Sequence, residues 1–253
     1  MRFLRWRTAF PSSRTSEALP RAAGKPPIAQ GPKRASPAGQ QKPPRARFRL
    51  SPVRNVFGLD ISDASVEGVE LKFRRGGGFE IRAYNRILLP KDVIADGDIL
   101  RPDALQSALK SLLDGARPER FSNHAVVTLP EAKVYVHTFD FPVSLREKEV
   151  RNAIPYEAEG VIPVDLSTME TDLLFHRSQD QKTRHVFFAA VPRTLVAQYA
   201  SALRAVGVEP VAFDVESAAL ARADTGPRAE PVVVADIGAR RTTLIVVEHE
   251  TVH

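Results

Sequence analysis

The chain has 253 residues, of which 43% are hydrophobic, and it contains no cysteine. This length allows one large domain or two small ones with a buried core, and the lack of cysteine excludes disulfide bridges, thiolate metal sites and a cysteine nucleophile, as suits the reducing cytoplasm. The longest apolar runs, 187–191 and 232–235, have the length of strands and fall short of the ~20 residues of a membrane-spanning helix, so we expect the chain not to cross a membrane.

The net charge of +6 is concentrated at the N-terminus. Residues 1–50 hold twelve Lys or Arg and one acid, which leaves 24 basic and 29 acidic residues, a net charge of −5, in residues 51–253. These first 50 residues are rich in Pro, Ala, Arg and Ser without hydrophobic periodicity, which predicts a disordered tail. Residues 1–7 interleave Arg with Phe, Leu and Trp and could contact anionic lipid or RNA, or form an inert extension. Because the excess of basic residues lies in the tail, we expect no specific nucleic-acid binding by the remainder.

Three β-rich runs follow, at residues 56–61, 66–73 and 79–89. Arg75-Gly76-Gly77-Gly78 joins the second run to the third and predicts a hairpin turn. It is not a phosphate loop, because no Lys-Ser/Thr pair and no helix follow it. Leucines at helical spacing then predict an amphipathic helix over residues 102–116 that faces the core, with Pro102 in its first turn.

The next segment is predicted to be a compact strand-helix-strand-strand unit. Its strands are expected at residues 134–141, 173–176 and 185–191, and its helix at 144–160. Ser144 and Glu147 fit a capping box and Gly160 fits a helix end, whereas Pro155 predicts a kink or a break within the helix. His176 and His185 are expected to be paired strand positions rather than metal ligands.

The remainder alternates helices and strands. Helices are predicted at 194–206, ended by Gly207, and at 216–223, and strands at 211–215, 232–236 and 242–247.

Two segments far apart in the chain, 57–66 and 234–243, share one plan. Each is a β-rich run that ends in an Asp, followed by a turn of small residues and a second β-rich run. Backbone N–H groups in such a turn form a nest for an anion, and the carboxylate can hold Mg²⁺ through water. The predicted contacts to phosphate and Mg²⁺ are Asp60, Ser62, Ser65, Asp236, Gly238, Thr242 and Thr243. Taken singly, Asp60 and Asp236 could instead each cap their own turn.

These two hairpins resemble the phosphate-binding hairpins of the actin-like ATPase fold. Residues 56–250 further resemble the N-terminal part of the family of the type IV pilus assembly protein PilM, a relative of the cell-division protein FtsA. The segments that carry this resemblance are Gly58-Leu59-Asp60-Ile61-Ser62, Glu157-Ala158-Glu159 with Ile162-Pro163, Ala189-Ala190-Val191-Pro192, residues 205–210 leading to Asp214-Val215-Glu216, and Asp236-Ile237-Gly238.

The resemblance implies an α/β fold, namely an actin-like ATPase lobe on a ribonuclease H-like sheet with an inserted strand-helix-strand-strand subdomain. The implied organisation is a basic tail over 1–50, the first part of the lobe over 51–130, the inserted subdomain over 131–192, and the continuation of the lobe over 193–253, ending before a second lobe.

The resemblance also implies a cytoplasmic scaffold, peripheral on the inner membrane, in the platform that assembles type IV pili for fimbrium biogenesis and twitching motility. The implied partners are the N-terminal cytoplasmic peptide of a PilN-type bitopic membrane protein and other platform proteins, with indirect membrane contact aided by the tail. ATP with Mg²⁺ is implied as a structural or switching ligand, with binding favoured over hydrolysis.

Two other interpretations stay open: a GspL-like cytoplasmic domain of type II secretion, and a nucleotide-hydrolysing actin-like or FtsA-like ATPase. Kinase chemistry would need a general base and a two-lobed cleft, which the sequence does not show, so no catalytic residue is predicted. Relative to the family's pattern, Ser62 stands in place of Gly and Glu67 in place of Lys. Like charges ~4 Å apart repel by roughly 4 kcal/mol at an intermediate dielectric, so Glu67 disfavours phosphate at that position.

Overall fold

The computed structural model of the chain describes residues 55–75, 77–177, 182–224, 231–238, 242–248 and 251–252. The tail over 1–50, Gly76 of the predicted turn and residues 239–241 of the second hairpin lie outside the described residues. The elements in chain order are β1 (Phe57–Ile61), β2 (Ser65–Phe73), β3 (Phe79–Leu88), β4 (Ile94–Ala95), β5 (Asp98–Ile99), α1 (Pro102–Asp114), β6 (Arg117–Pro118), β7 (His124–Leu129), η1 (Glu131–Lys133), β8 (Tyr135–Pro142), α2 (Glu147–Glu159), η2 (Leu166–Thr168), β9 (Met169–Arg177), β10 (Thr183–Pro192), α3 (Arg193–Arg204), β11 (Glu209–Val215), α4 (Glu216–Asp224), β12 (Val232–Ile237), β13 (Thr242–Glu248) and β14 (Thr251–Val252).

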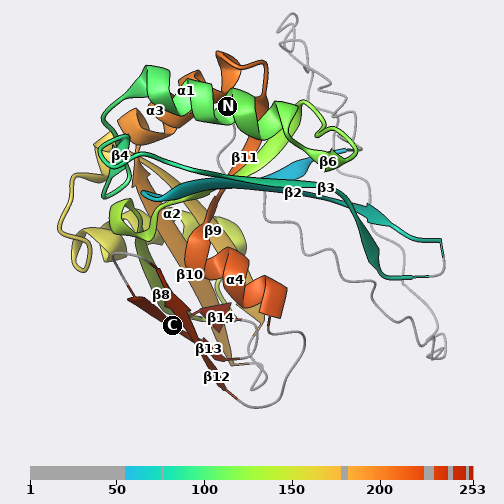
Figure 1. The fold of residues 1–253 in the computed structure, drawn as a ribbon. Helices are drawn as coiled ribbons and strands as arrows, with labels where there is room; N and C mark the ends of the chain where they lie inside the picture. The colour runs from blue at the N-terminus through green and yellow to red at the C-terminus, as the bar shows by residue number, and fades with distance from the viewer. Residues whose placement is uncertain are drawn as a thin grey trace, which may run out of the picture. The chain divides into compact units, whose positions relative to one another are not determined.

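The largest sheet has six strands in the order β11-β7-β1-β2-β3-β6. β1, β2 and β3 pair in antiparallel fashion, whereas β7 and β11 run parallel to β1. This is the predicted ribonuclease H-like arrangement of an actin-like lobe (Figure 1). Alternate residues of β1 (Phe57, Leu59 and Ile61) are buried in one cluster with apolar residues of α1 and α3, so both helices cover the same face of the sheet.

The predicted inserted unit forms a separate sheet in the order β8-β10-β9. Helix α2 covers one face, because Val150, Ile154 and Ala158 pack with Phe139, Phe188 and other sheet residues. The strand-helix-strand-strand prediction is therefore confirmed, and His176 lies directly opposite His185 as a cross-strand pair.

Two details of α2 differ from the prediction. The helix begins at Glu147, not at Ser144, and it is Glu149 that accepts the backbone N–H of Arg146 (2.8 Å). Ser144 lies in a turn in which the N–H of Leu145 donates to the carbonyl of Pro142. The helix starts after this turn. The helix also continues through Pro155, whose side chain is exposed while Ile154 and Ala158 are buried. Packing of the buried face thus outweighs the hydrogen bond lost at proline.

Strands β12, β13 and β14 form a three-stranded antiparallel sheet of their own, so among the described strands after residue 193 only β11 joins the six-stranded sheet. Ile245 and Val247 of β13 pack against Ala221 and Leu220 of α4. No helix in the described part of the chain is both long and apolar enough to cross a membrane.

The short hairpin of β4 and β5 was not predicted. Its turn contains Asp96 and Gly97, both with positive φ, and the backbone N–H groups of these two residues donate to the carboxylate of Asp63 (3.0 and 3.2 Å). The carbonyl of Gly97 accepts the buried hydroxyl of Tyr199 on α3 (3.0 Å). This hairpin therefore ties the β1–β2 turn to α3.

Candidate functional site

Asp60 lies at the end of β1, where the carboxyl ends of the parallel strands β1, β7 and β11 meet at one edge of the sheet. Its carboxylate accepts a hydrogen bond from the hydroxyl of Thr128 on β7 (2.5 Å). The pKa of Asp60 is raised, first because the side chain is buried and then because Glu67 and Asp236 add negative charge nearby. Open α/β sheets bind ligands at this edge.

Asp236 occupies the equivalent place at the end of β12, opposite Thr243 of β13. Its charge raises the pKa of Asp60, so the two predicted hairpins approach the same point. Side chains alternate along a strand, which places Asp236 and Thr243 on the side of β13 that packs against α4. The exposed Thr242 lies opposite Ile237 on the other side, and Gly238 is exposed at the end of the described strand.

A third acid, Glu216, completes the cluster, although the sequence did not single it out as a site residue. It is the first residue of α4, directly after β11. Its pKa is raised to about 7, first by burial and then by the negative charges of Asp60, Asp236 and Glu131, in that order. The sequence signal that could have revealed it is an acid at the junction between a parallel strand and the next helix.

Glu131 fixes the start of α4. Its carboxylate accepts the backbone N–H of Ser217 (3.2 Å) and the hydroxyl of the same residue (3.0 Å). An acid is favourable at a helix N-terminus, where the backbone N–H groups lack partners within the helix. Asp214 at the end of β11 pairs with Arg222 one turn further along α4. Glu216 is thus held at the site by contacts on both sides of it.

The turn between β1 and β2 is closed by its own serine. The Oγ of Ser62 accepts the backbone N–H groups of Ala64 (3.3 Å) and Ser65 (3.1 Å). The Oγ of Ser65, itself buried, donates to Glu67 (2.9 Å), and Glu67 forms an ion pair with Arg86 (2.9 Å). Two of the amides predicted to bind phosphate therefore already have an acceptor, and the substitution of Ser for Gly at position 62 accounts for it.

The three acids suit a divalent cation better than a bare anion. Among the described residues, no three His, Cys, Asp or Glu side chains lie close enough together to hold a metal ion directly. Carboxylate oxygens that hold the ion through water are the arrangement that Mg²⁺ prefers. Since the charge of Asp236 raises the pKa of Asp60, and the charges of Asp60 and Asp236 raise the pKa of Glu216, a cation between these acids would relieve a repulsion that the protein itself leaves in place.

Comparison with known proteins identifies a family and several solved structures to which this chain is similar. The model of the family described as type IV pilus assembly protein PilM matches residues 58–253. Among solved structures, a PilM-PilN type IV pilus biogenesis complex is 26% identical with a TM-score of 0.66, and the match covers 78% of this chain and 59% of that chain. The chain thus spans 59% of the length of that relative.

Two more distant structures also match. The cytoplasmic domain of EpsL, an inner-membrane component of the type II secretion system of Vibrio cholerae, is 15% identical with a TM-score of 0.49, covering 78% of this chain and 68% of that chain. A Bacteroides thetaiotaomicron protein with an actin-like ATPase fold and unknown function is 7% identical with a TM-score of 0.39, covering 78% and 67%.

Proposed function

This chain belongs to the family of the type IV pilus assembly protein PilM, and we propose that it is a scaffold on the cytoplasmic side of the inner-membrane platform that assembles type IV pili. The observation that supports this most is the family match over 58–253, together with a six-stranded sheet whose order is that of an actin-like lobe. The proposed location is the cytoplasm, peripheral to the inner membrane.

The proposed partner is the N-terminal cytoplasmic peptide of a PilN-type bitopic membrane protein. The solved relative was determined as a PilM-PilN complex, which supports a partner of this kind. On this chain the inserted sheet offers places for an extended peptide, because β8 and β9 are its outer strands and no other described strand pairs with their outer edges. A peptide that adds to such an edge gains main-chain hydrogen bonds from unpaired backbone groups.

The proposed ligand of the acidic cluster is ATP with Mg²⁺, acting as a structural or switching ligand. Mg²⁺ would neutralise the negative charge that phosphate and the carboxylates share. Asp60, Glu216 and Asp236 would hold it through water, while Thr128 orients Asp60 and Glu131 anchors the helix that carries Glu216. We expect binding rather than appreciable hydrolysis, because Ser62 occupies amides of the first hairpin that would otherwise align the phosphates.

A fluorescence-anisotropy titration of the full chain tests both proposals. The probe is a labelled N-terminal peptide of a PilN-type protein from the same organism, and a scrambled peptide of the same composition is the control. Specific binding whose affinity does not change with Mg-ATP supports the scaffold and contradicts a role for the nucleotide in partner binding. Specific binding that changes with Mg-ATP supports a switching ligand, and an equal response to both peptides contradicts the proposed partner.

A further inference from the structure

The outer half of the β2–β3 ribbon carries large apolar side chains that the described protein leaves uncovered. Three cross-strand pairs form this surface, which we call the apolar strip: Val69 with Tyr84, Leu71 with Ile81, and Phe73 with Phe79. All six side chains are between 41 and 66% exposed. The rings of Phe73 and Phe79 meet edge to face with their centroids 5.5 Å apart, so the end of the strip is already ordered by its own packing.

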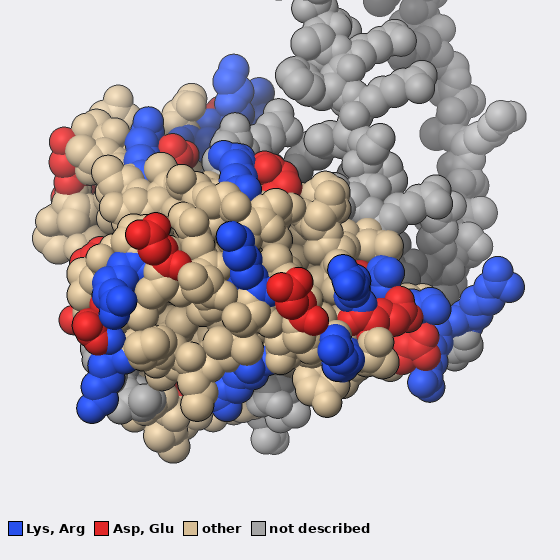
Figure 2. Space-filling model, turned by 45° about the horizontal axis from the view of Figure 1, so that its top comes forward, with Lys and Arg blue, Asp and Glu red and all other residues tan. Residues whose placement is uncertain are grey.

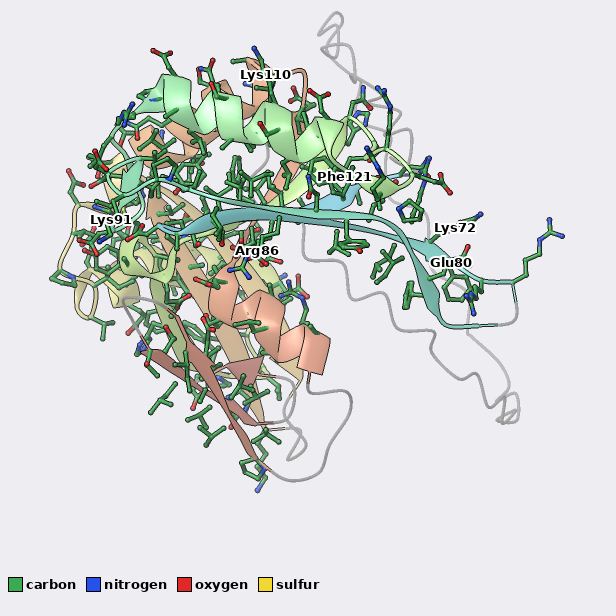
Figure 3. The ribbon with its side chains drawn as sticks, viewed as in Figure 1. Lys72, Glu80, Arg86, Lys91, Lys110 and Phe121 are labelled. Atoms are coloured by element: carbon green, nitrogen blue, oxygen red, sulfur yellow. The ribbon has the colours of Figure 1, made fainter. Side chains whose placement is uncertain are left out.

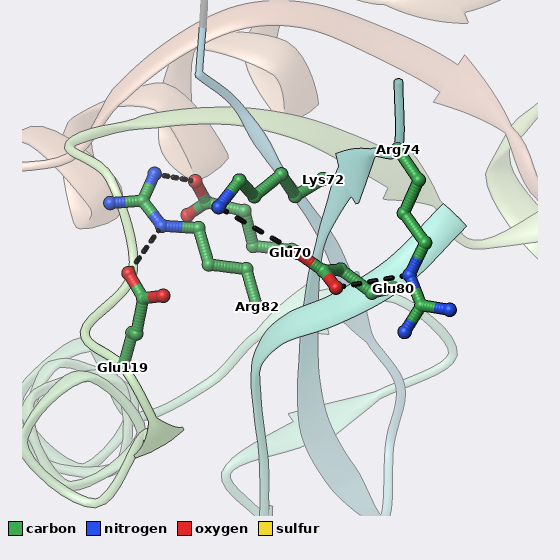
Figure 4. A network of polar contacts seen from close by, with 6 residues as sticks. All are labelled: Glu70, Lys72, Arg74, Glu80, Arg82 and Glu119. Carbon is green, nitrogen blue, oxygen red and sulfur yellow. Dashed lines mark hydrogen bonds and ion pairs between the residues drawn. The ribbon is translucent and has the colours of Figure 1, made fainter. Parts of the chain in front are cut away.

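The opposite side of the ribbon is polar, and its charges are matched among themselves. Glu80 pairs with Lys72 (3.6 Å) and Arg74 (3.0 Å), and Arg82 pairs with the buried Glu70 (2.8 Å) and with Glu119 (2.9 Å), as Figure 4 shows. In the space-filling view, blue and red side chains alternate over this part of the molecule (Figure 2). A face of this kind is stable in water, so the ribbon has one side suited to solvent and one side that is not.

Pleating fixes which way each side faces. Lys72 points to the side of the ribbon on which α1 lies, whereas Arg86 points to the side of α4 (Figure 3). Arg86 pairs with Glu67 in the same cross-strand alternation as the apolar pairs, so the apolar strip lies on the side of α4. The register shift at Glu70 and Leu71 keeps the apolar residues on that one side as the ribbon leaves the body of the sheet.

The two ends of the apolar strip carry opposite charge. The outer end has the exposed Arg75 beyond Phe73, whereas the neighbouring Arg74 is paired with Glu80 on the polar side. The inner end leads to Glu67, which Arg86 neutralises, and to Asp60 opposite it; Asp60 and the nearby Asp236 leave this end with an excess of negative charge. Two ribbons laid face to face in opposite directions would bring the basic end of each onto the acidic end of the other. A surface that complements itself in this way is what a two-fold interface requires.

We propose that the apolar strip is a self-association surface on which a second copy of this chain packs, with the two ribbons antiparallel about a two-fold axis near Leu71 and Ile81. Aromatic side chains bury roughly 150–250 Å² each, so six large side chains about half exposed offer on the order of 500 Å² per copy. The pair would bury on the order of 1,000 Å², which reaches the lower range of specific interfaces and fits a reversible dimer.

The absence of native cysteine makes a direct test possible, because any introduced thiol is the only one. The full chain carrying Ile81→Cys is treated with a short bis-maleimide, and Lys110→Cys on α1 (Figure 3) is the matched control. The proposal predicts a covalent dimer from the Ile81 variant and little from the control. Equal cross-linking of both variants, or none of either, overturns it.

Sedimentation velocity over a range of concentrations provides the second measurement. We expect Leu71→Glu and Ile81→Glu to raise the dimer dissociation constant at least tenfold, and Lys110→Glu to leave it unchanged. Both strip positions are already half exposed, so an unchanged circular dichroism spectrum and melting temperature will show that these variants fold. A wild-type chain that stays monomeric at all concentrations overturns the proposal and indicates that a different protein covers the apolar strip. A dimer whose dissociation constant is unchanged in both strip variants also overturns it, because self-association then uses another surface.

Discussion

The carboxyl groups of Asp60 and Glu67 occupy directly opposite positions on β1 and β2, an arrangement that is unfavourable for two like charges. Glu67 is compensated by Arg86 (2.9 Å) and by the hydroxyl of Ser65 (2.9 Å), whereas Asp60 has the hydroxyl of Thr128 and a raised pKa. The candidate site is therefore held in an electrostatically strained state that a cation would relieve.

Replacing Ser62 by Gly tests whether the first hairpin can bind phosphate. The substitution removes the oxygen that accepts the N–H groups of Ala64 and Ser65 and releases both amides for an anion. We expect Ser62→Gly to lower the dissociation constant for Mg-ATP at least fivefold in isothermal titration calorimetry, and to cost about 1 kcal/mol of folding stability. Ser144→Gly, in a turn on another sheet, is the control, and an affinity equal to that of the wild type would count against this hairpin as a phosphate site.

The raised pKa of Glu216, about 7 against an ordinary value of 4.5, makes stability depend on pH. Between these values the folded protein keeps a proton that the unfolded chain has released, so stability falls as the pH rises from about 4.5 to about 7. Each pKa unit corresponds to roughly 1.4 kcal/mol, which must be discounted for a side chain partly in solvent. We therefore expect Glu216→Gln to stabilise the protein at pH 8 by about 1 kcal/mol and to leave it unchanged near pH 4.

Mg²⁺ should act on the same group in the same pH range. We expect millimolar Mg²⁺ to raise the melting temperature of the wild type at pH 8 and to have a smaller effect on Glu216→Gln, because the cation replaces the missing proton. The exposed Glu157 on α2 provides the control variant Glu157→Gln. Equal Mg²⁺ responses in all three proteins would show that the ion binds elsewhere.

Glu70 is an ionisable group inside the sheet, only 1% exposed. It accepts from Arg82 (2.8 Å) and from the backbone N–H of Ser122 (2.6 Å). Removing one partner of a buried pair leaves an uncompensated charge, which costs roughly 3–5 kcal/mol. We expect Arg82→Met to lose about 3 kcal/mol in urea unfolding, and the double variant Glu70→Leu/Arg82→Met to lose less than the sum of the two single changes.

The exposed pair of Glu80 with Arg74 serves as the comparison on the same ribbon. Surface ion pairs contribute about 0–1 kcal/mol, so Glu80→Gln should cost less than about 0.5 kcal/mol. Similar losses for Arg82→Met and Glu80→Gln would contradict a special role for the buried carboxylate.

Much of the sheet could be predicted from the sequence because its signals are local. Runs rich in β-forming residues indicated β1 and β2, and the glycines at 77 and 78, both with positive φ, indicated the turn after β2. Asp60 and Asp236 were proposed as site residues because each ends a segment built on the same short plan. By contrast, β4 and β5 have two residues each, too few for any periodicity, and their turn is held by Asp63 and Tyr199 from distant segments.

The parts of the site that escaped prediction depend on contacts between segments. In the sequence, Glu216 looks like an ordinary acid in the first turn of a helix. The parallel pairing of β7 and β11 brings it to the edge of the sheet at which β1 ends and Asp60 lies. Ser62 departs from the family's pattern by one side chain, but its effect on the turn follows from geometry rather than from residue type. Pro155 was likewise misjudged from residue type, because packing of the buried face of α2 keeps the helix continuous through the proline.

Gly97 and Gly207 offer a matched test of how the β1–β2 turn is anchored. Both have a left-handed backbone (φ +82° and +80°), but a Cβ on Gly97 would lie 2.4 Å from the Cγ of Pro130, whereas a Cβ on Gly207 would meet nothing within 4 Å. Alanine at either position carries the backbone cost of about 1 kcal/mol, and only Gly97→Ala adds a clash with a rigid ring. We expect losses of about 3 kcal/mol for Gly97→Ala and about 1 kcal/mol for Gly207→Ala in urea unfolding. Because Gly97 donates to Asp63 and accepts from Tyr199, Gly97→Ala should also weaken the Mg²⁺-dependent stabilisation. Equal losses for the two variants would show that the hairpin moves aside and does not fix the turn.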